Sequence, residues 1–181
     1  MSNILWHVTM SLDGFTTGPD EDPGWAFRRP LGRVPLAAEI PGRVGAILAG
    51  RRWYDVGLRH EEASYAPYGG SIAVPVFVLT HTPPAHAERK VRFLSGDLGA
   101  AVETARGAAS GKDVVLFGAT LATSAIAAGL VDEVIMHIVP VFLGGGVPAW
   151  RHPLHPFAFE TLEILPGDQA VTWRLRPGPK D

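Results

Sequence analysis

The sequence lacks cysteine altogether, and this absence excludes disulfide bonds, thiolate metal sites and cysteine nucleophiles. It also lacks any apolar run close to the roughly 20 residues that a membrane-spanning helix requires. Its first residues do not have the basic region and long apolar core of a signal peptide. Charged residues make up only 19% of the chain and the net charge is −2, so composition gives no support for a nucleic-acid partner. We therefore expect a cytoplasmic protein that binds neither nucleic acid nor a membrane.

The two common nucleotide-binding fingerprints are absent as well. The chain contains neither GxGxxG nor the P-loop pattern with its Lys and Ser or Thr. His152 and His155 lie three residues apart, but Pro153 and Pro156 disfavour a helix there and no third ligand accompanies them. We expect no metal site.

What is present is a chain of 181 residues, 46% of them hydrophobic, which suits one domain with a sizeable core. The 16 Pro and 21 Gly are spread among turns and loops, with no cluster that reads as a linker. We therefore treat residues 1–181 as a single domain.

The most informative segment is 114–139. An apolar run ends at Phe117-Gly118, a helix pattern follows over 119–128 and stops at Gly129, and a second apolar run covers 133–141. A strand-to-helix turn of this kind leaves backbone N–H groups at the helix start unpaired, where they can receive a phosphate. The segment therefore makes a nucleotide the first ligand to consider, although a tight turn with small residues for packing gives the same pattern.

The rest of the chain predicts strands alternating with helices. We expect strands at 4–10, 44–48, 74–79 and 91–94, a short helix at 33–40 that ends before Pro41, a loop at 57–70, a helix over 97–109 with Asp97 as its N-cap, and a hairpin of 159–165 with 170–175. This order predicts an α/β fold with a mixed, mainly parallel central sheet, helices on its faces and an antiparallel C-terminal edge. Ligands of such sheets bind beyond the carboxyl ends of the strands, so the turns that follow the strands are expected to line one cleft.

Three further turns carry chemistry that suits such a cleft. Gly50-Arg51-Arg52-Trp53 opens a predicted helix, where two guanidinium groups suit a phosphate or remain solvated. Thr80-His81 ends a strand, where a hydroxyl and an imidazole suit a ribose phosphate or simply bind water. Asp13 follows the first strand and either contacts a substrate N–H, relays a proton, or caps its own turn before Gly14.

These features, in this order, resemble the dihydrofolate reductase-like superfamily, and within it the C-terminal reductase domain of the bacterial riboflavin protein RibD and its stand-alone relatives. The resemblance covers nearly the whole chain. Its pieces are Met10–Phe15, Gly50–Tyr54, Val78–Thr80, Phe117–Leu121, Ala128–Glu133 and Pro140–Gly146.

The resemblance implies a three-layer dihydrofolate reductase-like fold, a homodimer, and a reductase that uses NADPH. By analogy, Arg51, Arg52, Thr80 and His81 hold the side of the adenosine 2′-phosphate, next to Gly50 and Trp53. Gly118, Ala119, Thr120 and Leu121 hold the diphosphate, the backbone around Thr9, Thr17 and Gly18 meets the nicotinamide, and Asp13 faces the substrate. The cofactor supplies the hydride, and the acceptor is a C=N or C=O group of a small, heterocyclic substrate.

Two departures from the family narrow this expectation. The family usually has Gly-Gly where this chain has Phe117-Gly118, and a true dihydrofolate reductase has an acid on its first long helix, where this chain has only Glu39. Folate is therefore not the expected substrate. A reductase for a specialised metabolite, a nucleotide-binding protein without turnover, and a plain α/β domain remain the alternatives.

Overall fold

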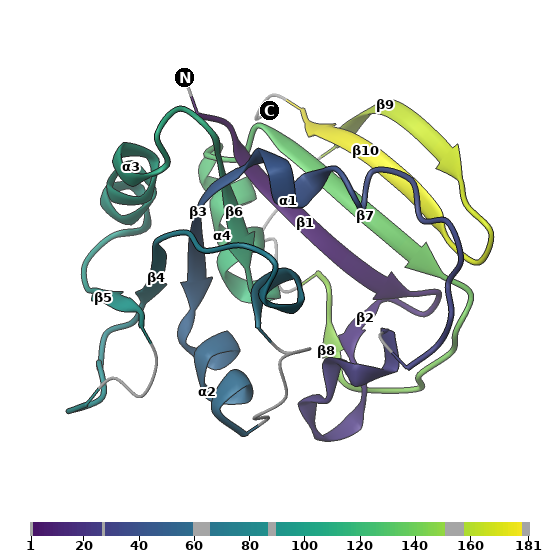
Figure 1. Cartoon of the computed structure of the whole chain (residues 1–181), viewed down its shortest axis with the longest axis horizontal. Coiled ribbons are helices and arrows are strands. Elements are labelled where there is room, and N and C mark those ends of the chain that lie inside the picture. The colour runs from purple at the N-terminus through teal and green to yellow at the C-terminus, as the bar shows by residue number, and fades with distance from the viewer. Residues whose placement is uncertain (1, 27, 60–65, 87–89, 151–157, 179–181) are drawn as a thin grey trace.

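The computed structural model describes residues 2–26, 28–59, 66–86, 90–150 and 158–178. Its centre is an eight-stranded sheet with the strand order β5-β4-β3-β6-β1-β7-β10-β9 (Figure 1). The sheet strands are β1 (Ile4–Ser11), β3 (Val44–Gly50), β4 (Val76–Leu79), β5 (Arg92–Leu94), β6 (Asp113–Phe117), β7 (Glu133–Val139), β9 (Phe159–Pro166) and β10 (Val171–Pro177).

The pairing within the sheet matches the predicted pattern. The ladders that join β5, β4, β3, β6, β1 and β7 are all parallel, whereas β10 pairs antiparallel with both β7 and β9. The mixed sheet with an antiparallel C-terminal hairpin at its edge is therefore confirmed. A second, two-stranded antiparallel sheet of β2 (Phe15–Thr17) and β8 (Val147–Pro148) lies near the carboxyl end of β1 (Figure 1).

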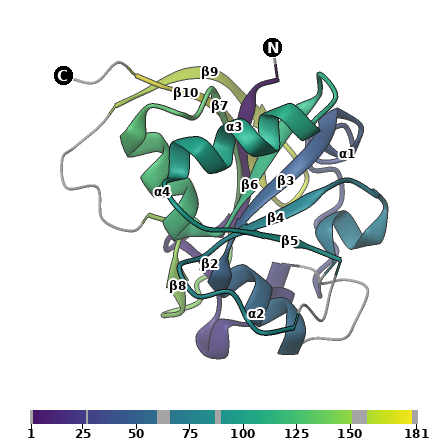
Figure 2. The ribbon, with the colours of Figure 1, turned by 90° about the vertical axis from the view of Figure 1, so that its left-hand side faces the viewer.

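Helices cover both faces of the sheet because successive strand residues point to opposite sides. The helices α3 (Leu98–Ala108) and α4 (Ala119–Ala128) share one apolar cluster with Ile4, Trp6 and Met10 of β1. The helices α1 (Ile40–Arg43) and α2 (Arg51–Arg59) contribute Ile40 and Tyr54 to a second cluster with Leu5. Figure 2 shows α3 and α4 on one side of the sheet and α1 on the other. The result is three layers, as the resemblance implied.

Two helix ends have the predicted chemistry. Asp97 precedes α3, and its carboxylate accepts a hydrogen bond of 2.9 Å from the backbone N–H of Ala100. Gly129 ends α4 in the left-handed conformation, with φ 72° and ψ 28°.

The predicted helix at 33–40 is wrong. Residues 31–34 are extended or irregular and 35–39 form turns, and Leu36 has a positive φ of 67°. The short helix α1 instead begins at Ile40 and has Pro41 in its first turn. Proline there costs little because the first N–H groups of a helix have no intrahelical partner, so Pro41 starts a helix that we expected it to end.

Smaller differences affect other boundaries. Gly57 to Arg59 complete α2 instead of opening the loop predicted at 57–70, and residues 67–70 of that loop form a 3₁₀ helix. Strand β4 begins two residues later than predicted, and β7 ends two residues earlier, directly before Pro140.

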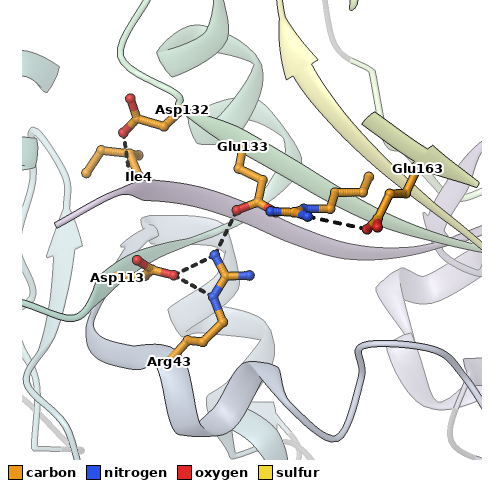
Figure 3. Close-up of polar contacts among 7 residues, drawn as sticks. Ile4, Arg43, Asp113, Asp132, Glu133 and Glu163 are labelled. Atoms are coloured by element: carbon orange, nitrogen blue, oxygen red, sulfur yellow. Dashed lines mark hydrogen bonds and ion pairs between the residues drawn. The ribbon is translucent and has the colours of Figure 1, made fainter. Parts of the chain in front are cut away.

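A network of charged residues joins four strands at the amino ends of β6 and β7 (Figure 3). The buried Glu133 accepts hydrogen bonds from Arg43 at 2.7 Å and from Arg174 at 2.5 Å. Arg43 also pairs with Asp113 at 2.7 Å, and Arg174 contacts Glu163 at 3.3 Å. Burial raises the pKa of Glu133, but the two guanidinium groups outweigh it and the net pKa is lowered. These residues hold the sheet together at the end opposite to the turns singled out in the sequence.

Among the described residues, no helix is long and apolar enough to cross a membrane.

Candidate functional site

The structure brings the turns after β3, β4 and β6 together at one edge of the sheet. Gly50 is paired in register with Leu79, and Ala49 with Phe117. A Cβ atom added to Gly118 would lie 3.8 Å from the backbone N of Gly50. The predicted convergence of these turns at the carboxyl ends of the strands is confirmed.

The turn between β6 and α4 presents backbone donors. Gly118 is the residue before α4 and has φ 101° and ψ 125°, a conformation that L side chains rarely adopt. No side chain caps this helix start. The N–H groups of Ala119, Thr120 and Leu121 therefore have no intrahelical partner, since the first such bond runs from Ala122 to Gly118 at 3.0 Å. Donors arranged in this way fit a phosphate.

A gap in the sheet opens beside this turn. The ladder between β1 and β6 covers only Ile4 to Trp6, whereas β1 stays paired with β7 as far as Ser11. Within the described chain, the residues of β1 from His7 onward therefore have a strand neighbour on one side only. This split in the sheet, flanked by Thr9 on β1 and by Gly118 on the other side, offers unpaired backbone groups to a ligand.

Thr17 and Gly18 lie in a wall next to the carboxyl end of β1. The Thr17 hydroxyl accepts a hydrogen bond of 3.3 Å from the N–H of Val147. A Cβ atom at Gly146 would overlap the carbonyl oxygen of Thr17 and lie 2.7 Å from that of Gly18. Only glycine fits at this contact, so the glycine-rich segment after β7 serves close packing of backbones.

Asp13 connects the loop after β1 to the loop after β7. Its carboxylate accepts hydrogen bonds from the Ser11 hydroxyl at 2.7 Å, from the N–H of Leu143 at 3.1 Å and from that of Gly144 at 2.7 Å. Partial desolvation raises the pKa of Asp13, but the bonds from Ser11, Leu143 and Gly144 together lower it below its usual value. The group is therefore an ionised acceptor at neutral pH that fixes two loops at the site.

The two arginines of the Gly50 turn have different partners. Arg51 donates to the Thr82 carbonyl at 2.6 Å and to Asp55 at 2.7 Å. Arg52 pairs with Glu21, which also binds Arg59 at 2.5 Å, and these bonds lower the pKa of Glu21. Arg51 therefore lies against the turn that contains Thr80, whereas Arg52 holds the 3₁₀ helix Pro19–Glu21.

The remaining predicted residues of this edge have structural partners or are exposed. The hydroxyl of the buried Thr80 accepts a hydrogen bond of 3.2 Å from the N–H of Thr82, within its own turn. His81 is exposed. The Trp53 ring stacks on Phe117, with 5.4 Å between centroids.

Sequence reasoning missed a polar cluster on the sheet face that carries α1 and α2. His7 on β1 and His137 on β7 face each other with 2.8 Å between their Nε2 atoms. The Tyr68 hydroxyl lies 3.1 Å from His7 Nδ1, and the Thr172 hydroxyl lies 2.8 Å from His137 Nδ1. The sequence offered one signal, namely that His7 and Thr9 alternate with apolar residues in the strand predicted at 4–10.

Metal binding has no support in the part of the chain that the structure describes, since no group of three or more His, Asp or Glu side chains is gathered there. His152 and His155 lie outside the described residues.

Comparison with known proteins places this fold in a family. The family model described as the RibD C-terminal domain matches residues 2–155. No curated protein sequence matches the chain at a significant level.

Solved structures with the same fold cover almost the whole chain. A proposed riboflavin biosynthesis protein from Shewanella sp. PV-4 is 23% identical, with 99% of this chain and 100% of that chain covered and a TM-score of 0.78. The diaminohydroxyphosphoribosylaminopyrimidine deaminase/5-amino-6-(5-phosphoribosylamino)uracil reductase of Thermotoga maritima is 14% identical, with a TM-score of 0.66 and coverage of 98% of this chain but only 57% of that chain. Dihydrofolate reductase from Enterococcus faecalis, complexed with NADP(H), is 12% identical, with coverage of 98% and 97% and a TM-score of 0.63. These TM-scores establish a shared dihydrofolate reductase-like fold.

Proposed function

The chain belongs to the RibD C-terminal domain family, and on that premise we propose that it is an NADPH-dependent reductase of a small heterocyclic substrate. The observation that carries the proposal is the split between β1 and β6 beside the uncapped start of α4. A dinucleotide needs donors for its diphosphate and an opening for its nicotinamide, and both occur here at adjoining turns.

Different residues bind different parts of the cofactor. The N–H groups of Ala119, Thr120 and Leu121 hold the diphosphate, and glycine at positions 50 and 118 lets it approach the backbone. Arg51, beside Thr80 and His81, takes the 2′-phosphate of the adenosine. Arg52 contributes when Glu21 releases it. The backbone at Thr9 and the wall of Thr17 and Gly18 contact the nicotinamide.

When bound, the cofactor supplies a hydride to a C=N or C=O carbon, and the heteroatom of that bond takes up a proton. The protein positions the two rings and excludes water. Asp13 orders the loops around the site, and it passes a proton from water to the heteroatom that needs one.

We further propose that the protein is a homodimer. The apolar strand β7 is an internal strand that is paired with β1 on one side and with β10 on the other. Among the described residues, five large apolar side chains are exposed. Phe142 and Leu12 lie in loops, whereas Ile164, Val171 and Trp173 lie on the neighbouring hairpin and are 56%, 42% and 37% exposed. Trp173 is paired in register with Ile164, so the two share a face that suits a second copy of the chain.

Transfer of deuterium from C4-deuterated NADPH to a panel of pyrimidine, pterin and specialised heterocyclic acceptors tests the reductase. We expect NADPH oxidation that depends on one acceptor class, with one deuterium in the product, and slower turnover in Asp13→Asn. Tight cofactor binding without transfer to any acceptor would instead favour the nucleotide-binding protein without turnover.

A further inference from the structure

Four polar side chains form one continuous hydrogen-bonded chain across β1, β7 and β10. It runs from Tyr68 through His7 and His137 to Thr172, with atom separations of 3.1, 2.8 and 2.8 Å. The Thr172 hydroxyl then donates to the backbone carbonyl of Pro35 at 3.1 Å. The register pairs His137 with both Thr9 and Thr172, so the chain lies across the sheet face that carries α1 and α2.

The Pro35 carbonyl sets the direction of every bond in this chain. A carbonyl oxygen only accepts hydrogen bonds, so the Thr172 hydroxyl must donate its one proton to the Pro35 carbonyl. It must then accept a hydrogen bond from Nδ1–H of His137. His137 in its neutral form then has an unprotonated Nε2, which accepts from Nε2–H of His7. His7 is left with an unprotonated Nδ1, which accepts the hydroxyl proton of Tyr68. Each donor points from Tyr68 toward Pro35.

Both imidazoles stay neutral, as this order of donors and acceptors requires. Burial lowers the pKa of His7 to about 3, with further lowering by His137 and by the nearby Arg43. Burial also lowers the pKa of His137 to about 4. Burial raises the pKa of Tyr68, which keeps its proton in place. Other charged groups on this face are Glu133 and Arg174, which pair with each other next to Arg43.

The Tyr68 end of the chain lies at the split in the sheet. His7 is the first residue of β1 beyond Trp6, the last one paired with β6. The Tyr68 ring stacks on His7 with 5.7 Å between centroids and lies 5.9 Å from Phe117, the residue before Gly118. Among the described residues, no hydrogen bond is donated to the hydroxyl oxygen of Tyr68. With its proton turned toward His7, that oxygen has only lone pairs to offer to a ligand.

We propose that Tyr68 and His7 form a hydrogen-bond-accepting wall of the substrate pocket, where the Tyr68 oxygen holds a ring N–H or hydroxyl of the substrate. The inference rests on the proposed reductase function. Tyr68 contacts the substrate, whereas His7, His137 and Thr172 are positioning residues that set which way the Tyr68 hydroxyl points. The pocket therefore selects heterocycles that carry a donor over those in which the same position is alkylated.

Nitrogen-15 NMR of the imidazole side chains tests the assigned direction of these hydrogen bonds without any ligand. We expect the Nε2–H tautomer for His7 and the Nδ1–H tautomer for His137. Thr172→Ser, which keeps the hydroxyl, preserves both. Thr172→Val removes the acceptor of His137 and shifts the pair to the opposite tautomers. Opposite tautomers in the unmodified protein would overturn the assigned direction.

Binding of uracil and of 1,3-dimethyluracil to the protein saturated with NADP⁺ tests the pocket. Uracil has two ring N–H groups and dimethyluracil has none. A single neutral hydrogen bond corresponds to a preference for uracil of about five- to tenfold. We expect that preference in the unmodified protein and in Thr172→Ser, and its loss in Tyr68→Phe and Thr172→Val.

The outcomes separate this proposal from the one it rests on. An unchanged preference in Tyr68→Phe, or no binding of uracil to protein that binds NADP⁺, would overturn the accepting wall and leave the cofactor site intact. Failure of the unmodified protein to bind NADP⁺ or NADPH would contradict the reductase, whatever the tautomers are. Tyr68→Phe should bind NADPH within about twofold of the unmodified protein, because the diphosphate donors lie on α4.

Discussion

At the scale of single residues, the molecule places two histidines in positions where a charge is costly. His7 and His137 sit on adjacent central strands and share one hydrogen bond between them. The pKa of each is lowered, to about 3 and about 4, and the first cause in both is burial. Polar groups in such positions are tolerated because each ring nitrogen has a partner.

The pair predicts a loss of stability in mild acid. Unfolding raises both pKa values to about 6.5. As the pH falls from about 6.5 toward 4, the unfolded chain binds protons that the folded chain does not. The free energy of unfolding then decreases by up to about 1.4 kcal/mol per pH unit for each histidine. Carboxylates with a lowered pKa, such as Glu133, decrease the free energy of unfolding further only when the pH falls below their ordinary pKa range.

Urea unfolding at pH 7, 6, 5 and 4.5 measures this effect. His7→Gln should roughly halve the slope between pH 6.5 and 4.5, while substitution of the exposed His81 by Gln should preserve it. The NMR resonances of His7 and His137 should not titrate above pH 5. Titration of either ring near pH 6.5 in the folded protein would contradict the account.

At the scale of elements, the start of α4 is where structure and proposed chemistry meet. Gly118 has the backbone conformation that turns β6 into α4, and no side chain caps the helix. At the other end of the same helix, Gly129 also has a positive φ, in the left-handed region, but it lies away from the Gly118 turn. The two glycines therefore form a matched pair for substitution.

We predict that Gly129→Ala lowers the free energy of unfolding by about 1–2 kcal/mol and that Gly118→Ala lowers it by at least as much, because alanine is strained at positive φ. Only Gly118→Ala should also weaken NADPH binding, since it displaces the first N–H groups of α4. Urea unfolding and a cofactor titration of both variants provide the measurement. Equal NADPH affinity in the two variants would show that this turn does not hold the diphosphate.

The elements also show how far sequence carries the argument. Periodicity and end signals located the strands and the ends of α3 and α4, because Asp97 and Gly129 act through their immediate neighbours. The prediction of a helix at 33–40 was wrong because a proline can either end a helix or stand in its first turn. Which of the two applies to Pro41 depends on where the first turn begins. The pairing of Arg52 with Glu21 and of His7 with His137 joins residues 31 and 130 positions apart, and no local pattern encodes such contacts.

At the scale of the whole molecule, the network of charged residues joins the strands at the amino ends of β6 and β7, whereas β1 and β6 separate toward their carboxyl ends. The hairpin β9–β10 has an exposed apolar face, and we assign it to a second copy of the chain. Sedimentation equilibrium should give a dimer for the unmodified protein and a monomer for Trp173→Glu. Leu12→Glu is the control, because Leu12 is 64% exposed but lies in the loop after β1, outside the hairpin. A monomeric unmodified protein would refute the assignment.

The central claim is that the converging turns bind NADPH, and a titration of the protein with NADPH and NADH, followed by energy transfer from its 5 Trp residues to the nicotinamide, tests it most directly. We predict micromolar binding of NADPH and at least about tenfold weaker binding of NADH, the difference expected for a charge-assisted contact to the 2′-phosphate. Arg51→Ala should remove most of that difference. Arg59→Ala, which breaks an ion pair with Glu21 but lies at the far end of α2, should preserve it. Absence of binding of either nucleotide, or an unaltered preference in Arg51→Ala, would contradict the account.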